Sequence, residues 1–298
     1  MTTIIKLYDH QASIHAQYAR IVLHLAGIEY KKIHIDLPLG NLDPSYAKIS
    51  PSLSVPALEI ISTRNNNKTT LTDSRDIINY CTRRTDGLFP KDKMDEINTI
   101  LDLIYKANGG QISFQSYAPQ DKIFDVAVNK IMSSLRQRKL RKLAHKESNN
   151  LNNIPKSPRK KVYKSAVERL DRPIGCIVTL DELILSANET MSVLDEKLSK
   201  SKWLLGDEHT AIDSIAAIWV QWIVYNNNLE SIPITSRVLD FLNQSKQRSE
   251  WKKTKVEWVI PYIKRRVYLG ICVMIGLMYL LANKFGSSLL GIIVFILE

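Results

Sequence analysis

The N-terminal third of the chain alternates between patterns typical of strands and of helices. Thr3–Tyr8 is β-branched and alternates apolar with polar positions, which predicts a strand. In Ser13–Ala26 the apolar side chains recur at helical spacing and Gly27 follows as a stop, which predicts a helix. The predicted order is βαβαββα, the second strand being parallel to the first, with strands over Thr3–Tyr8, Tyr30–Ile35, Ala57–Ile61 and Thr69–Leu71 and helices over Ser13–Ala26, Asp43–Ile49 and Asp73–Arg84.

Helical patterns dominate from Asp92 onward. Thr210 and Asp213 have the spacing of a capping box at the start of an apolar helix. The three nearby tryptophans are expected in the core rather than in a ligand site: Trp203, Trp219 and Trp222. Further helices are predicted over Met94–Asn108, Val178–Ser199, Leu239–Trp251 and Lys252–Ile263.

The C-terminal region contains an apolar run, Val267–Ala282, with no charge and no proline. At about 1.5 Å per residue the run spans roughly 24 Å, so it predicts a short membrane helix; the alternative is a buried core helix. Lys264, Arg265 and Arg266 precede it, and the positive-inside rule then places the bulk of the protein in the cytosol. A short span with basic flanks favours the mitochondrial outer membrane. The N-terminal sequence has no signal-peptide pattern.

Charge changes this picture in one segment. The net charge is +11, and residues 130–172 carry all of it, with 14 Lys or Arg against three Asp or Glu. This segment belongs to a predicted insertion at about 113–172, which either is a solvated charged arm or binds anionic lipid or an acidic protein. Nucleic acid is not favoured as a partner, because Tyr163 is the only Phe, Tyr or Trp within residues 130–172 that could stack on bases. Three cysteines without a paired motif argue against disulfides, and no metal site is predicted.

Two short motifs have chemical consequences. Val55 and Pro56 directly precede the third strand, where a proline often forms a cis bond in a tight turn. Asp73 and Ser74 place oxygen acceptors and free backbone N–H groups at a helix N-terminus, which favours a carboxylate ligand.

Together these motifs resemble the thioredoxin-like domain of glutathione transferases. LYDHQASIHAQYARIVLHLAG is similar to that domain's first strand and helix, SVPAL to its cis-proline turn, and LTDSRDIINYC to its acidic-Ser motif. IDLPLGNLDPSYAKISPSLSVPALEI is very similar to the tail-anchored ganglioside-induced differentiation-associated protein family. The element GDEHTAID resembles one in transferase helical domains, although His209 and Ser214 replace its usual apolar pair, which puts local stability in doubt.

The resemblance implies roles for five residues. Ser13 would be the catalytic hydroxyl that stabilises the glutathione thiolate, helped by the N-terminus of its own helix. The backbone of Val55, fixed by Pro56, would pair with the cysteinyl unit, and Asp73 and Ser74 would bind the amino and carboxylate ends of glutathione. The alternative for each is structural: a helix cap for Ser13, Asp73 and Ser74, and a fold-determining turn for Pro56. A Ser–His pair using His10 or His15 is not favoured, because no acid partner is evident.

The predicted architecture is an α/β domain followed by an all-α domain. The boundaries are 1–88 for the thioredoxin-like domain, 89–263 for the helical domain with its basic insertion, and 267–282 for the tail anchor. The family implies a role in mitochondrial shape or redox homeostasis, with weak or no conventional conjugation. The alternative is an active, membrane-anchored glutathione transferase, and the resemblance allows a homodimer.

Overall fold

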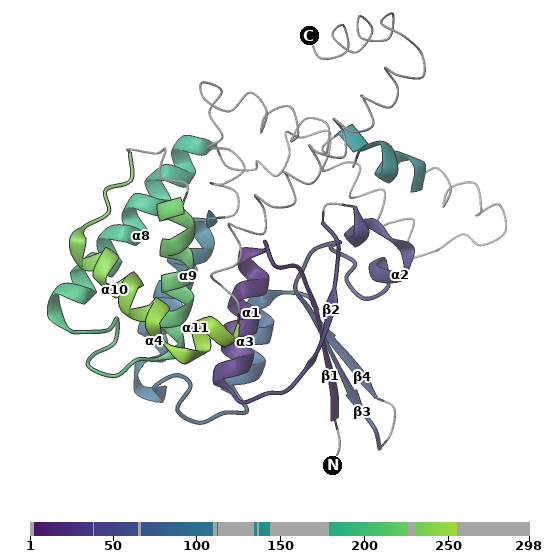
Figure 1. Ribbon diagram of the computed structural model, residues 1–298, viewed down its shortest axis with the longest axis horizontal. Coiled ribbons are helices and arrows are strands. Elements are labelled where there is room, and N and C mark those ends of the chain that lie inside the picture. The colour runs from purple at the N-terminus through teal and green to yellow at the C-terminus, as the bar shows by residue number, and fades with distance from the viewer. Residues whose placement is uncertain are drawn as a thin grey trace, which may run out of the picture. The chain divides into compact units, whose positions relative to one another are not determined.

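The computed structural model describes residues 3–37, 39–64, 67–109, 112, 134–135, 137–143, 179–225 and 231–254. The chain divides into two units, Met1–Val256 and Glu257–Glu298. All described residues belong to the first unit. Figure 1 shows its sheet with helices α1 and α3 beside it, and the helical half on the far side of those two helices.

The sheet has four strands: β1 (Thr3–Asp9), β2 (Lys31–His34), β3 (Ala57–Ser62) and β4 (Lys68–Leu71). Their spatial order is β2-β1-β3-β4, with β2 parallel to β1 and the other pairs antiparallel. Tyr8 lies opposite Ile33 on one side and opposite Ala57 on the other. The predicted order, the parallel pair and the β3–β4 hairpin are confirmed, and the thioredoxin-like arrangement with them.

Three helices accompany the sheet: α1 (Ile14–Leu25), α2 (Pro44–Ala47, preceded by the 3-10 turn Gly40–Leu42) and α3 (Ser74–Thr82). Helix α1 buries the predicted apolar face, and Gly27 follows its C-cap at a φ of +64°, where glycine is favoured. Helix α1 also buries two polar residues that its pattern did not predict, Gln17 and Arg20. The expected cis bond lies between Val55 and Pro56.

The helical half contains α4 (Met94–Lys106, preceded by the 3-10 turn Lys91–Lys93), α8 (Leu180–Lys200), α9 (Ala211–Tyr225), α10 (Ser236–Gln247) and α11 (Ser249–Lys253). Helix α9 packs against both α1 and α4, which joins the two halves of the unit. Trp219 is fully buried and its Nε1 donates to the carbonyl of Ala107 at 2.8 Å. Trp203 and Trp222 are also buried, as expected of core residues.

The helix predicted over Leu239–Trp251 is wrong in its bounds. Helix α10 starts at Ser236, where the Thr235 side chain caps it, and ends at Gln247. Arg248 is extended, with φ −69° and ψ 147°, so α11 is a separate helix. The helix predicted over Lys252–Ile263 is described only as far as Thr254, where α11 ends, and the rest lies outside the described residues.

The polar pair at the start of α9 is stabilised in another way than the usual apolar one. Ser214 Oγ and His209 Nε2 share a hydrogen bond of 3.2 Å. Burial, and secondly the charge of Arg248, lower the pKa of His209 to about 4. Half of the predicted capping box is present, because the buried Asp213 carboxylate accepts from the amide and hydroxyl of Thr210. The Asp213 amide donates to the Thr210 carbonyl rather than to the Thr210 hydroxyl. Burial raises the pKa of Asp213.

Two predictions fall wholly or largely outside the described residues. The apolar run Val267–Ala282 lies outside the described residues, and within the described ranges no helix is long and apolar enough to cross a membrane. Of the basic insertion, residues 134–135 and 137–143 are described, all helical. Leu140 is only 1% exposed and packs against Leu42, Ala47 and Leu53, so the interpretation as a solvated arm is wrong for this part.

Candidate functional site

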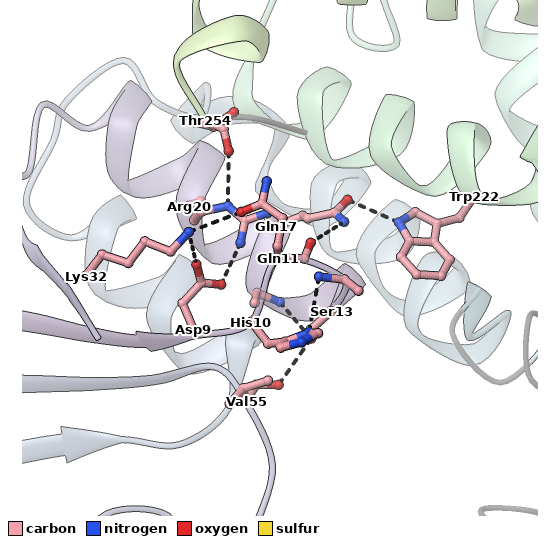
Figure 2. Close-up of polar contacts among 12 residues, drawn as sticks. Asp9, His10, Gln11, Ser13, Gln17, Arg20, Lys32, Val55, Trp222 and Thr254 are labelled. Atoms are coloured by element: carbon pink, nitrogen blue, oxygen red, sulfur yellow. Dashed lines mark hydrogen bonds and ion pairs between the residues drawn. The ribbon is translucent and has the colours of Figure 1, made fainter. Parts of the chain in front are cut away.

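Ser13 lies at the end of the loop that connects β1 to α1. It is the N-cap of α1, and its Oγ accepts a hydrogen bond from the amide of Ala16 at 3.3 Å. The same Oγ donates to the carbonyl of Val55 at 3.4 Å (Figure 2). The fold therefore brings Ser13 next to the cis Val55–Pro56 peptide, 42 residues away in sequence.

The segment before the cis peptide is fixed by three side chains. Tyr46 Oη and Ser50 Oγ both donate to the carbonyl of Ser54, at 2.6 and 3.0 Å. Asn41 Nδ2 donates to the carbonyl of Leu53 at 2.5 Å. These bonds tie the backbone on the N-terminal side of Val55 to α2 and to the 3-10 turn before it. An extended ligand pairing with the Val55 backbone would thus meet a preorganised edge.

Asp73 and Ser74 begin α3, as the sequence predicts. Asp73 is the exposed N-cap, and its Oδ1 accepts from the amide of Arg75 at 2.7 Å. Ser74 is 3% exposed, and its Oγ is 2.6 Å from Tyr105 Oη and 3.4 Å from His15 Nδ1. The helical half thus reaches the start of α3 through Tyr105, a contact that the sequence did not predict.

Burial sets the protonation of the side chains around Ser74. Desolvation raises the pKa of Tyr105, so its phenol stays neutral and can donate or accept a hydrogen bond. Desolvation also lowers the pKa of His15, although the nearby Asp73 carboxylate acts in the opposite direction. His15 stacks near Tyr105 and Tyr18, with ring centroids 5.5 and 5.8 Å away. The two side chains that contact the Ser74 hydroxyl, Tyr105 and His15, are therefore held in their neutral forms by burial.

The imidazole hydrogen bonds observed for the two histidines that flank Ser13 are made to groups other than the Ser13 hydroxyl. His10 accepts the Ser13 amide through its backbone carbonyl, and its Nδ1 accepts from the amide of Ala12 at 3.2 Å. The His15 ring contacts Ser74. The observed contacts thus give Ser13 a backbone acceptor, Val55, in place of a histidine base.

A buried ion pair supports the turn before Ser13 and was not anticipated. Asp9 and Arg20 are 0% and 2% exposed, with Arg20 Nη1 2.5 Å from Asp9 Oδ1 and Lys32 Nζ 2.9 Å from Asp9 Oδ2. Arg20 Nε also donates to the carbonyl of Thr254 at 3.1 Å, which ties the end of α11 to α1 (Figure 2). Nothing in the sequence marked Arg20, since an arginine on a helix is usually exposed.

Gln17 makes a second link between the turn and the helical half. Its Nε2 donates to the carbonyl of Gln11 at 3.2 Å, and its Oε1 accepts from Trp222 Nε1 at 3.1 Å. The loop that presents Ser13 is thereby attached to α9 as well as to the sheet.

One group of metal-binding residue types also lies beside this loop. His10, His34 and Asp36 each offer a ligand atom within 4.8 Å of the others. The Ala12 amide donates to His10 Nδ1, so the proton of the neutral ring sits on Nε2. A cation could bind at either nitrogen of His10 only after this arrangement changed. His34 Nε2 lies 3.8 Å from Asp36 Oδ1.

Comparison with known proteins agrees with this geometry. The family described as "Glutathione S-transferase, N-terminal domain" matches residues 12–84, which include all five predicted site residues. The chain has the glutathione transferase fold. No curated protein matches its sequence.

Solved transferase structures cover most of the chain at low identity. A glutathione transferase family member from Pseudomonas fluorescens, with two glutathione bound, is 16% identical at a TM-score of 0.54, covering 84% of this chain and 92% of that one. A glutathione transferase from Burkholderia graminis, with two glutathione molecules per subunit, is 18% identical at a TM-score of 0.56, covering 84% and 87%. Glutathione transferase F7 from Populus trichocarpa is 17% identical at a TM-score of 0.53, covering 85% and 98%.

Proposed function

We propose that this chain is a glutathione-binding, transferase-like protein with weak or no conventional conjugation activity. The observation that carries the proposal is the contact between Ser13 Oγ and the Val55 carbonyl beside the cis Val55–Pro56 bond. The hydroxyl that would meet the cysteinyl thiol and the strand-like backbone edge that would pair with the cysteinyl backbone are thus neighbours. Solved structures of this fold whose titles name bound glutathione support the choice of ligand.

The same contact supports weak turnover. A serine hydroxyl has one proton to donate, and Ser13 gives it to Val55 in the ligand-free protein. To stabilise a thiolate, Ser13 must rotate and give up this bond, which at 3.4 Å is longer than usual and is worth about 0.5 kcal/mol, the lower end for a protein hydrogen bond. The net stabilisation of the thiolate is therefore smaller, and the pKa of the bound thiol is lowered by less.

Calorimetric titration of the protein with glutathione tests the proposal. We expect binding in the millimolar range or tighter, with Ser13→Ala leaving the affinity nearly unchanged and Pro56→Ala weakening it. Thr99→Ala is a control that removes an exposed hydroxyl whose observed hydrogen bond is to the Asp95 carbonyl of its own helix, α4. The absence of any heat or thermal shift at millimolar glutathione would leave Ser13 and Asp73 as helix caps only, and Ser74 as a contact between α3 and Tyr105.

The second candidate is an active glutathione transferase, favoured by the place of Ser13 at the N-terminus of α1. In that case the glutathione thiol releases its proton, and the thiolate forms a carbon–sulfur bond as the electrophile's leaving group departs. Conjugation to a general aryl halide, compared between the protein and Ser13→Ala, decides between the candidates. A large loss of turnover in Ser13→Ala favours the enzyme, and equal background rates favour the binding protein.

We further propose a tail anchor at 267–282 in the mitochondrial outer membrane, with the domains at 1–88 and 89–263 in the cytosol and a role in mitochondrial shape or redox homeostasis. The resemblance to the ganglioside-induced differentiation-associated protein family and the uncharged run support this. The protein should stay with membranes through an alkaline carbonate wash. The double substitution Leu277→Arg and Leu280→Arg should release the protein, because each charge at a span centre costs about 2.5–3.5 kcal/mol.

For the basic insertion we propose binding to anionic lipid or to an acidic protein, with a homodimer as the assembly. The local charge excess supports the first part. Binding to anionic vesicles should weaken as the salt concentration rises. Replacing four cations by Ser should also weaken it without lowering the melting temperature: Arg159, Lys160, Lys161 and Lys164. Sedimentation of the purified protein tests the dimer.

A further inference from the structure

Part of the basic insertion is attached to the α2 side of the sheet. Leu140 is buried against Leu42, Ala47 and Leu53, and Leu143 packs against the same cluster. Lys139 Nζ donates to the carbonyl of Leu39 and to Asp43 Oδ1, both at 2.9 Å. The short teal helix near α2 in Figure 1 is this segment. We call residues 138–143 the insertion helix.

The insertion helix holds the stretch of chain that leads into the cis peptide. Leu53 has a φ of +56°, in the left-handed region that a leucine adopts only when its surroundings enforce it. Its side chain is 2% exposed and contacts the cluster that Leu140 completes. Val55, whose carbonyl meets Ser13, follows two residues later. The strained Leu53 thus lies between the insertion helix and the candidate ligand site.

The opposite face of the insertion helix is cationic. Arg138, Arg141 and Lys142 are exposed and have the i, i+3, i+4 spacing that places side chains on one helix face. Leu140 and Leu143 share the other face, which is covered. Both faces can therefore be occupied at the same time.

We propose that the insertion helix couples two ligands. Its cationic face binds anionic phospholipid headgroups, and its packing against the α2 side raises the affinity for glutathione at the cis-proline loop. This inference rests on the proposed glutathione binding. A cationic helix face without aromatic side chains complements a surface of phosphate and carboxylate charge. The uncharged run Val267–Ala282 in the same chain favours a membrane over a soluble acidic protein as the source of that charge.

The coupling follows from the energetics of docking. Glutathione binds through the Val55 backbone only when the preceding segment is in its bonded conformation, so its apparent affinity scales with the populated fraction of that conformation. A helix this short is marginal in water by itself, so Arg138, Arg141 and Lys142 share one face mainly when the helix is packed against the α2 side. Lipid that binds this face therefore favours the packed state and raises this fraction. By linkage, glutathione must strengthen lipid binding by the same factor.

The experiment uses the full chain in vesicles of phosphatidylcholine alone or of phosphatidylcholine with phosphatidylserine. Glutathione affinity is measured in both by calorimetry. We expect glutathione to bind more tightly with phosphatidylserine, by up to about fivefold, the lower end of usual coupling between sites, because the lipid-free protein already has the insertion helix docked. The difference should vanish at high salt. Equal affinity in the two vesicles overturns the inference. Absence of glutathione binding in both overturns the proposed function as well.

Three variants assign the effect to the two faces. Arg138→Gln with Lys142→Gln should abolish the phosphatidylserine effect and leave affinity in phosphatidylcholine unchanged. Lys31→Gln with Arg64→Gln removes the same charge from exposed positions elsewhere and should keep the effect. Lys139→Gln removes the contacts to Leu39 and Asp43 and should weaken glutathione binding in phosphatidylcholine. A phosphatidylserine effect that survives the first variant, or unchanged affinity in Lys139→Gln, contradicts the proposal.

Discussion

Ser13 and Ser74 occupy similar places at the starts of α1 and α3, yet different parts of the chain hold their hydroxyl groups. Ser13 Oγ bonds to backbone only, at Ala16 and Val55. Ser74 Oγ bonds to side chains, Tyr105 of the helical half and His15 of α1. The first end of the site is thus made by the thioredoxin-like fold itself, and the second needs both halves of the unit.

The difference has a functional meaning. A backbone-held hydroxyl depends on the sheet, the cis peptide and the loop before α1, which any sequence adopting this fold must supply. A hydroxyl held by side chains can be lost or retuned by one substitution in the helical half. We therefore expect the Ser13 end to respond mainly to changes in stability, and the Ser74 end to changes in local chemistry.

The largest effect is expected from Arg20, which supports the Ser13 end. Arg20→Met leaves the buried Asp9 carboxylate with only the half-exposed Lys32, and it removes the bond to the Thr254 carbonyl. Breaking a buried pair typically costs about 3–5 kcal/mol of unfolding free energy. Lys32→Met is the matched control and should cost about 1 kcal/mol or less. Denaturant unfolding measures the free energy of unfolding of both variants. Equal losses would show that Arg20 stabilises the fold no more than the exposed partner Lys32 does.

The second effect concerns Asp73 and glutathione binding. If glutathione binds as proposed, Asp73 meets its ammonium group, and Asp73→Ala should weaken binding by about 1.5–3 kcal/mol, roughly 10- to 150-fold. Ser13→Ala should weaken it less. Asp73→Asn separates the two roles of this residue, because an amide oxygen can still cap α3 but carries no charge. Wild-type affinity in Asp73→Asn would reduce Asp73 to a helix cap.

Local patterns were sufficient for the backbone of the site. Period-two alternation gave the strands, Ser13 and Asp73 gave the starts of α1 and α3, and Val55-Pro56 gave the cis turn. Each of these features depends on a few consecutive residues. They could be predicted because strand pairing, capping and turn geometry have signatures within one segment.

Contacts between distant segments could not be predicted in this way. Tyr105 looks like any aromatic residue on an amphipathic helix until α4 is placed beside Ser74. Arg20 looks like an exposed helix cation until Asp9 and Thr254 are placed around it. The docked insertion left one signal that could have been used: Leu140 and Leu143 recur at helical spacing within a run of cations, which is typical of a helix with one covered face.

A third prediction makes the Ser74 end sensitive to pH. Burial lowers the pKa of His15, so the unfolded chain binds more protons than the folded protein below the ordinary histidine pKa of about 6.5. Unfolding free energy should therefore fall as the pH drops from 7.5 to about 5.5, less steeply than burial alone would give because the Asp73 carboxylate opposes the shift. His15→Gln should show a shallower dependence. His209→Gln is the comparator, since the pKa of His209 is lowered to about 4. The same slope in His15→Gln and wild type would contradict the assignment.

The smallest predicted effect compares one hydrogen bond from each end. Tyr46→Phe removes the bond to the Ser54 carbonyl, and Tyr105→Phe removes the bond to Ser74 Oγ, each 2.6 Å long. Either should cost about 0.5–1.5 kcal/mol in unfolding free energy. In double-mutant cycles Tyr105→Phe should couple to Ser74→Ala, because the two groups share one bond, and should add independently to Ser13→Ala. Coupling of Tyr105→Phe to Ser13→Ala by more than about 0.5 kcal/mol would show that the two ends act as one network, and the distinction between a backbone-held and a side-chain-held hydroxyl would then lose its functional meaning.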